Sequence, residues 1–207
     1  SNTDHKTSVF NKKLITTKYE ILGLKLPFLR ALAKDIVKQN KYNIILNNLN
    51  FTYYEEMLMY GFILSQTPYD NYIKLELVDK YIYVFDNWSV VDSFCNSLKI
   101  IAKNKNFYIK FIKNYLKNEN EYIVRFAIVL LMDYYLDDEN IQESLELICS
   151  VKSDKYYIVM AQSWAYATAF AKNYELTLSF LSKNKNNISN TVLRKTISKC
   201  SDSFRIS

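Results

Sequence analysis

Apolar side chains recur three and four positions apart through most of the chain, which is the pattern of amphipathic helices. This period predicts a short first helix and then helices over residues 24–39, 41–49, 53–66, 69–84, 88–103, 105–118, 121–137, 140–150, 154–172, 174–184 and 188–200. Pro27 fits a first helical turn, and N-caps are predicted at Asn87, Asn120, Asp154 and Ser189 or Asn190. The chain is therefore predicted to be all-α, with short connections.

Short helices joined by turns of a few residues favour a superhelical stack of antiparallel helix pairs, as in HEAT and armadillo repeats. Trp88, Arg125 and Trp164 lie near the start or middle of long apolar helices and are 37 and 39 residues apart. The spacing is close to the ~40 residues of HEAT-like pairs. No linker interrupts the pattern, so we expect a single domain over residues 1–207.

Glycine and histidine are scarce, which narrows the possible chemistry. Gly23 and Gly61 are the only glycines, and the sequence has only two prolines. These are too few for the turns of β-sandwiches and barrels or for phosphate-binding glycine loops. The one histidine, His5, lies in the first few residues. Nucleotide-cofactor enzymes, histidine triads and histidine-rich metal sites are therefore disfavoured.

Three cysteines, Cys95, Cys149 and Cys200, are far apart and form no CxxC pair. With no signal-like start, they are typical of reduced, mostly buried cysteines in a cytoplasmic protein. No window approaches the ~18 uninterrupted apolar residues of a membrane span, so no membrane partner is expected.

The chain is basic. Lys and Arg number 27 and Asp and Glu 21, which gives a net charge of +6 and favours polyanions such as nucleic acid. The abundance of Lys, Asn, Ile, Tyr and Phe that an AT-rich genome produces is the alternative explanation. Where the charges lie therefore matters more than their sum.

An aromatic residue and a carboxylate share one face of the helix predicted over 88–103. Val91, Phe94, Leu98 and Ile101 form its apolar stripe, while Trp88 and Asp92, four residues apart, fall off that stripe with Lys99 roughly below them. The alternative is a half-buried tryptophan beside a solvated aspartate.

Arg125 interrupts a helix that is apolar nearly all round. In the first turns it opposes the positive end of the helix dipole, so an anion should lie near it. The candidates are Asp92, Glu121 and an external phosphate, and a salt bridge with Glu121 is the structural alternative.

Trp164 is the one very large side chain among small residues in the helix predicted over 154–172. It is either displayed or buried in an alanine-lined groove, and the sequence leaves both open.

At these residues the sequence resembles the AlkD family of DNA alkylation repair proteins, HEAT-like-repeat glycosylases that remove N3- and N7-alkylated purines. The segments Ile21–Pro27 and Leu29–Lys34, which includes Arg30, resemble the family's turn into a basic helix. Trp88-Ser89-Val90-Val91-Asp92 is similar to the family's W-x-x-V-D. Leu193-Arg194-Lys195 resembles its basic C-terminal helix, and the resemblance spans most of the chain.

The resemblance implies roles for these residues. Asp92 would be the catalytic carboxylate, Trp88 and Trp164 would flank the lesion nucleotide, and Arg125 would hold the DNA backbone. Phosphate contacts would come from residues on the concave face, with Lys25, Arg30, Lys34, Lys99, Lys103, Arg194, Lys195 and Lys199 as the candidates. No metal or cofactor is implied, the expected partner is double-stranded DNA, and the protein is expected to act as a monomer without flipping the base.

Two hypotheses follow. The first is a monofunctional DNA glycosylase with Asp92 essential. The second is a non-catalytic HEAT-like protein that binds damaged or branched DNA. The short N-terminus favours this second hypothesis, since only about ten residues precede Asn11 where active members of the family carry a longer helical stretch. A protein-binding helical scaffold is a third possibility, supported by the architecture alone.

Overall fold

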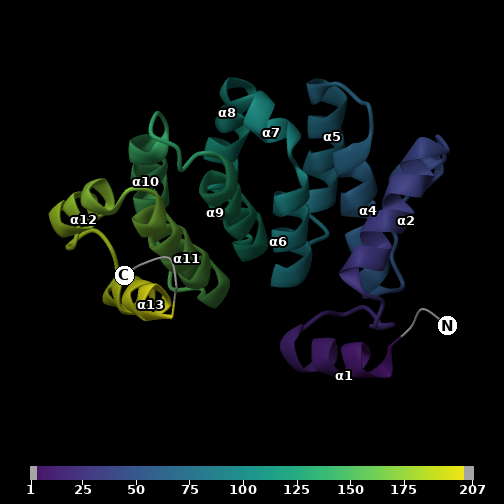
Figure 1. Ribbon diagram of the computed structural model, residues 1–207, viewed down its shortest axis with the longest axis horizontal. Coiled ribbons are helices and arrows are strands. Elements are labelled where there is room, and N and C mark those ends of the chain that lie inside the picture. Colours follow the sequence, from purple (N-terminus) through teal and green to yellow (C-terminus); the bar gives the residue numbers. More distant parts are fainter. Residues whose placement is uncertain (1–3, 203–207) are drawn as a thin grey trace. The chain divides into compact units, whose positions relative to one another are not determined.

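The computed structural model describes residues 4–202, with the side chain of His5 left out, and within this range the chain forms helices joined by short connections (Figure 1). In chain order the helices are α1 (His5–Leu14), α2 (Leu26–Lys38), α3 (Tyr42–Leu46), α4 (Tyr54–Gln66), α5 (Asn71–Ile82), α6 (Trp88–Ser97), α7 (Ile100–Lys103), α8 (Lys105–Tyr115), α9 (Glu121–Tyr134), α10 (Ile141–Ser150), α11 (Tyr156–Lys172), α12 (Tyr174–Lys183) and α13 (Asn190–Ser201). Within the described range, β-structure is limited to an isolated bridge between Glu20 and Tyr53. The all-α prediction is confirmed.

Contacts within the chain divide it into two compact units, an N-terminal unit (Ser1–Ile100) and a C-terminal unit (Ile101–Ser207). The expectation of a single domain stays a prediction.

In the N-terminal unit, α4 packs against both α2 and α6. Its inward face meets an aromatic cluster in which the Tyr81 ring contacts those of Tyr60, Phe85 and Phe94 at centroid distances of 4.6 to 5.0 Å. A Cβ on Gly61 would come within 3.0 Å of the Phe94 ring. The small residue therefore allows α4 to approach α6 closely.

A buried carboxylate fixes the loop between α1 and α2. Glu55 is 2% exposed, and its carboxylate accepts the backbone N–H groups of Leu22, Gly23 and Leu24 at 3.0, 2.8 and 3.3 Å. Gly23 has a φ of 86°, and a Cβ there would meet the Asp4 carbonyl oxygen at 2.7 Å. The conformation of this loop therefore depends on the buried Glu55 carboxylate, which binds its N–H groups, and on the missing side chain of Gly23.

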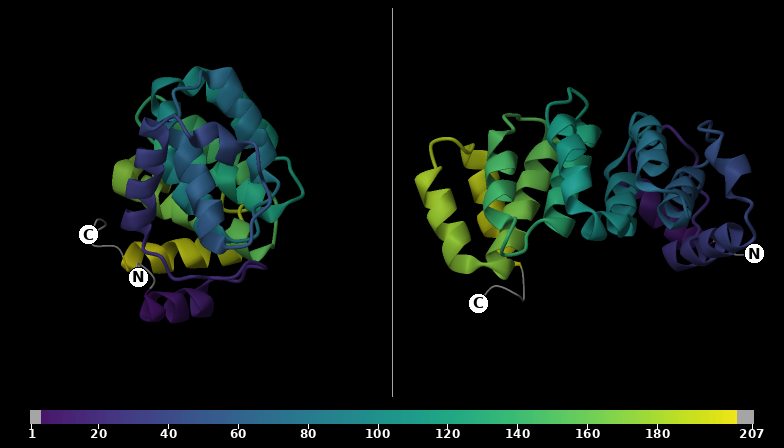
Figure 2. Two further views of the ribbon diagram at one scale, coloured as in Figure 1. Left: turned by 90° about the vertical axis from the view of Figure 1, so that its right-hand side faces the viewer. Right: turned by 90° about the horizontal axis from the view of Figure 1, so that it is seen from above.

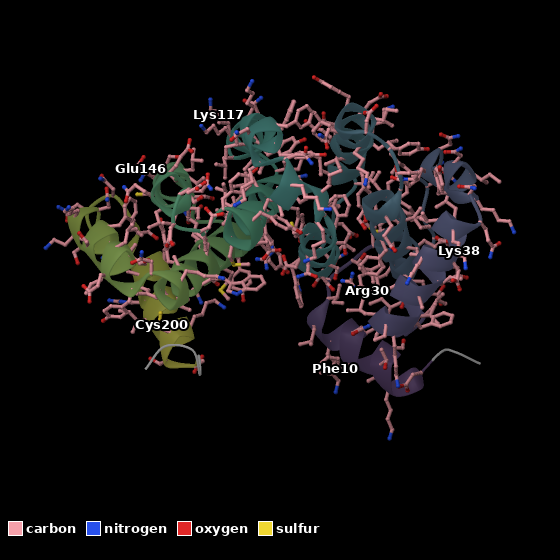
Figure 3. The ribbon with its side chains drawn as sticks, turned by 45° about the horizontal axis from the view of Figure 1, so that its top comes forward. Phe10, Arg30, Lys38, Lys117, Glu146 and Cys200 are labelled. Carbon is pink, nitrogen blue, oxygen red and sulfur yellow. The ribbon has the colours of Figure 1, made fainter. Side chains whose placement is uncertain are left out.

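α1 packs directly on this loop. Its Ser8 hydroxyl donates to the Ile21 carbonyl at 3.0 Å, and the Asp4 N–H donates to the Gly23 carbonyl at 3.2 Å. Phe10, labelled in Figure 3, extends from α1 and is 61% exposed. One face of α1 is therefore anchored to the loop while an apolar side chain on α1 faces solvent.

In the C-terminal unit, α11 packs against both α9 and α13 (Figure 2). α9 is buried on nearly every side, as its continuous apolar sequence predicts. The side chains of α11 are buried except for a narrow stripe. These two helices form the core of the unit.

The helix boundaries differ from prediction at two informative places. The helix expected over 88–103 ends at Ser97, whose hydroxyl donates back to the Ser93 carbonyl at 2.8 Å, and Leu98 leaves helical geometry with a ψ of 53°. The N-cap expected at Asp154 is wrong, because α11 begins after Lys155. Asn87, Asn120 and Ser189 do cap their helices with side-chain hydrogen bonds, as predicted.

Cys95 and Cys149 are buried and Cys200 is half-buried, and none of the three forms a disulfide within residues 4–202, which agrees with the prediction of mostly buried, reduced cysteines. None of the helices in residues 4–202 combines the length and hydropathy that a bilayer span requires.

Replacing Tyr166 by phenylalanine is expected to leave the free energy of unfolding unchanged or raise it by up to about 1 kcal/mol. Its buried hydroxyl makes no hydrogen bond of ordinary geometry among the described residues, and burial together with the neighbouring Cys149 thiol raises the pKa of the phenol, which stays neutral. Tyr135→Phe is the matched control, since the Tyr135 hydroxyl donates to the Lys105 carbonyl at 2.9 Å. Urea denaturation should show a loss of about 1 kcal/mol for the control. An equal loss for both variants would contradict the prediction.

Candidate functional site

Trp88 and Asp92 lie one turn apart at the start of α6. The helix begins at Trp88 because the Asn87 side chain accepts the Val90 N–H at 3.0 Å. Val91 and Phe94 are buried, whereas Trp88 and Asp92 are half-buried. Trp88 and Asp92 therefore lie off the buried stripe, as the spacing predicts, and the ring of Trp88 is half-buried, as the alternative describes.

The N-terminal end of α6 is hydrogen-bonded to the segment that follows α1. The Trp88 indole N–H donates to the Leu14 carbonyl at 3.2 Å. The Asp86 carboxylate accepts the Thr17 hydroxyl at 2.7 Å and the Lys18 N–H at 2.9 Å. Sequence reasoning missed these partners, which are more than sixty positions away along the chain.

Ser89 links α6 to the first residue of α4. Its hydroxyl and that of Tyr54 lie 2.7 Å apart in a hydrogen bond. Tyr54 is buried, and burial raises its pKa to about 12, so the phenol remains neutral at physiological pH. The first turn of α6 is thus held from α4 as well as from the α1–α2 connection.

Arg30 and Lys99 lie near the other end of α6. The Arg30 Nη1 donates to the Ser97 hydroxyl at 2.8 Å, and its guanidinium lies 4.2 Å from the Phe62 ring centroid (Figure 3 labels Arg30). Burial lowers the pKa of this guanidinium, which nevertheless stays protonated. Lys99 is exposed but lies beyond the end of α6, so helical spacing no longer places it below Trp88. Phosphate binding by either residue stays a prediction.

Arg125 is 6% exposed, and its side chain connects α9 to the first turn of α11. Its Nη1 donates to the Tyr157 carbonyl at 3.1 Å, while the Glu121 carboxylate accepts the Tyr157 N–H at 3.3 Å. The rings of Tyr122 and Tyr157 also contact each other, with centroids 5.2 Å apart and planes inclined by 36°. The guanidinium therefore has a structural partner, and its predicted contact with DNA stays a prediction.

Trp164 is 37% exposed on α11, between the buried Ser163 and Ala165, so the buried alternative for Trp164 is wrong. It continues a stripe of outward side chains with Tyr156 and Met160 at intervals of four residues. Tyr156 is 60% exposed. It was not predicted as a site residue, although its spacing of eight residues from Trp164 places both on one face of the helix.

Basic side chains of α13 adjoin this stripe. The Lys195 Nζ lies 5.9 Å from the Tyr156 ring centroid, and Arg194 is exposed. The Ser163 hydroxyl lies 2.8 Å from the Val159 carbonyl of its own helix and 3.2 Å from the Val192 carbonyl, so α11 and α13 are in close contact here. The C-terminal unit therefore presents aromatic and basic groups on adjacent helices.

The four predicted site residues belong to different units. Trp88 and Asp92 lie in the N-terminal unit, and Arg125 and Trp164 in the C-terminal unit. Their convergence on one surface therefore stays a prediction.

A basic, all-helical chain with an exposed tryptophan, a half-buried tryptophan and basic side chains on its helices has features typical of nucleic-acid-binding proteins. The family model described as DNA alkylation repair enzyme matches residues 1–200, so the chain belongs to the DNA alkylation repair family. This membership supports a role in alkylation repair and DNA as the partner. No curated protein matches the chain.

Proposed function

We propose that the protein is a monofunctional DNA glycosylase that hydrolyses the N-glycosidic bond of cationic N3- and N7-alkylpurines in duplex DNA. The proposal is carried by the placement of Trp88 and Asp92 one turn apart, both partly exposed, in a member of the alkylation repair family. We further propose that the helix pairs form one HEAT-like solenoid that binds DNA.

Asp92 supplies the charge that this reaction needs. An alkylated purine already carries a positive charge, so it leaves C1′ as a neutral base together with the electron pair of the glycosidic bond. Positive charge then develops on the deoxyribose, and a nearby carboxylate stabilises it. Water adds to C1′ and loses a proton, which completes the hydrolysis.

Trp88 and Trp164 contribute aromatic faces. A cation placed over an indole gains roughly 0.5–2 kcal/mol, and the gain disappears once the base has left as a neutral molecule. The two tryptophans therefore favour the charged lesion over unmodified purines. Tyr156, beside Lys195, extends the aromatic surface of α11 toward the basic groups.

Replacing both Arg194 and Lys195 by alanine is expected to make duplex binding less dependent on salt. Each lost phosphate contact reduces the slope of log K against log salt by about 0.9. The matched control is the double alanine variant of Lys183 and Lys185, which removes equal charge from exposed positions of the same unit. Fluorescence anisotropy with a labelled duplex at several salt concentrations measures the slopes. Equal slopes for the two double variants would exclude α13 from the interface.

The test of the function is the release of 3-methyladenine and 7-methylguanine from alkylated duplex DNA by excess protein. We expect release in a single-turnover reaction without added metal or cofactor. DNA binding without release would contradict the glycosylase and favour the non-catalytic DNA-binding protein. The absence of salt-dependent DNA binding would contradict both.

A further inference from the structure

The contacts around Trp88 restrain both the indole ring and the backbone group that binds it. The ring is attached through two rotatable side-chain bonds, and its N–H donates to the Leu14 carbonyl at 3.2 Å. Leu14 is the last residue of α1, so the direction of this carbonyl depends on the chain that follows. Two hydrogen bonds fix that chain, from the Thr17 hydroxyl at 2.7 Å and the Lys18 N–H at 2.9 Å to one oxygen of Asp86.

The acceptor residue is itself tied to α6. The other Asp86 oxygen accepts the Asn87 side-chain N–H at 2.7 Å, and the Asn87 side chain in turn caps α6 through the Val90 N–H. Asp86 therefore joins the α1–α2 connection to the helix that carries Trp88 and Asp92. We call this set of residues the Trp88 clamp, which consists of Leu14, Thr17, Lys18, Asp86 and Asn87.

The clamp satisfies the indole N–H while the ring stays half-buried. Core packing alone would be served better by full burial of the ring, because burial of apolar surface is the main stabilising contribution. A ring that must lie over a reacting nucleotide needs a fixed orientation before the substrate arrives. A hydrogen-bonded ring that keeps an exposed face meets this requirement.

We infer that the Trp88 clamp sets the orientation of Trp88 for base excision, with Thr17 and Asp86 as positioning residues. The inference rests on the proposed function for its catalytic consequence. Its structural part, the orientation of the ring in the free protein, is independent of any activity.

Thr17→Val and Asp86→Asn are the test variants. Valine keeps the shape of threonine without the hydroxyl donor, and asparagine replaces one carboxylate acceptor with a donor. Thr17→Ser keeps the hydroxyl and should behave as the parent. Thr67→Val is the matched control, because the Thr67 hydroxyl bonds the Leu64 carbonyl at the opposite end of α4 from Tyr54.

The first measurement is tryptophan fluorescence in a Trp164→Phe background, where Trp88 is the sole indole. We expect a shift of Trp88 emission to longer wavelength and stronger acrylamide quenching in Thr17→Val and Asp86→Asn, with no change in Thr17→Ser or Thr67→Val. Circular dichroism checks that each variant is folded. Unchanged emission and quenching in folded Thr17→Val and Asp86→Asn would overturn the inference.

The second measurement is excision kinetics on alkylated duplex, with Trp164 intact. We expect kcat to fall about tenfold in Thr17→Val and Asp86→Asn while KM stays nearly constant, since misorientation affects the reacting geometry more than DNA affinity. An unchanged kcat with altered fluorescence would overturn the positioning role. If the parent releases no base, the proposed function fails, and fluorescence alone then decides whether the clamp orients Trp88.

Discussion

Asp92→Asn is expected to lower the release of 3-methyladenine and 7-methylguanine by at least about 100-fold, the usual cost of removing a group that stabilises charge in the transition state. Asparagine has the shape of aspartate but no negative charge. It cannot offset the charge that develops on deoxyribose as the glycosidic bond breaks. The measurement is single-turnover release at excess protein, because the alkylated purine is then counted directly.

The control is Asp138→Asn, which makes the same change at an exposed position of the α9–α10 connection. Both variants lose one negative charge, so neither should bind duplex DNA more weakly than the parent, and their affinities should be similar to each other. Excision by the control should match the parent. Parental activity in Asp92→Asn would assign the catalysis to another group and remove the main support of the proposed mechanism.

Glu55→Gln is expected to reduce the free energy of unfolding by about 2–4 kcal/mol, because it disrupts a buried, charge-assisted set of hydrogen bonds. The carboxylate accepts three successive N–H groups, whereas glutamine offers one oxygen and turns its amide donor toward the others. Urea denaturation followed by far-ultraviolet circular dichroism measures the change.

Glu56→Gln tests whether burial is the cause. Glu56 is the next residue of α4, but it is exposed, and its carboxylate accepts the N–H groups of Thr52 and Tyr53 at the helix start. Glu56→Gln should reduce the free energy of unfolding by about 1 kcal/mol or less. Equal losses for the two variants would mean that the burial of Glu55 adds nothing to its contribution.

The helical pattern and the local caps could be predicted from the sequence because both depend on nearby residues. The period of apolar positions located α4, α9 and α11, and Asn87 marked the first residue of α6. With that start defined, the spacing of four residues placed Trp88 and Asp92 on one face. The half-buried state of both residues agrees with this prediction.

The supports of the site could not be predicted because they join distant parts of the chain. No local pattern pairs Leu14 with Trp88 or Thr17 with Asp86, and the acceptor at Leu14 is a backbone carbonyl that every residue carries. The end of α6 at Ser97 was also missed, since no glycine or proline marks it. The hydrogen bond from Arg125 to the Tyr157 carbonyl was missed because any residue offers a backbone carbonyl. The partners predicted for Arg125 were all anions.

The hydrogen bond from Trp88 to Leu14 also limits what this tryptophan can distinguish. An indole has one N–H donor and no acceptor, and here that donor is used within the protein. Trp88 can therefore offer a nucleotide its ring surface but no directional hydrogen bond to a base edge. Discrimination through this residue would depend on the charge and ring face of the base, and not on the donor and acceptor pattern that separates adenine from guanine.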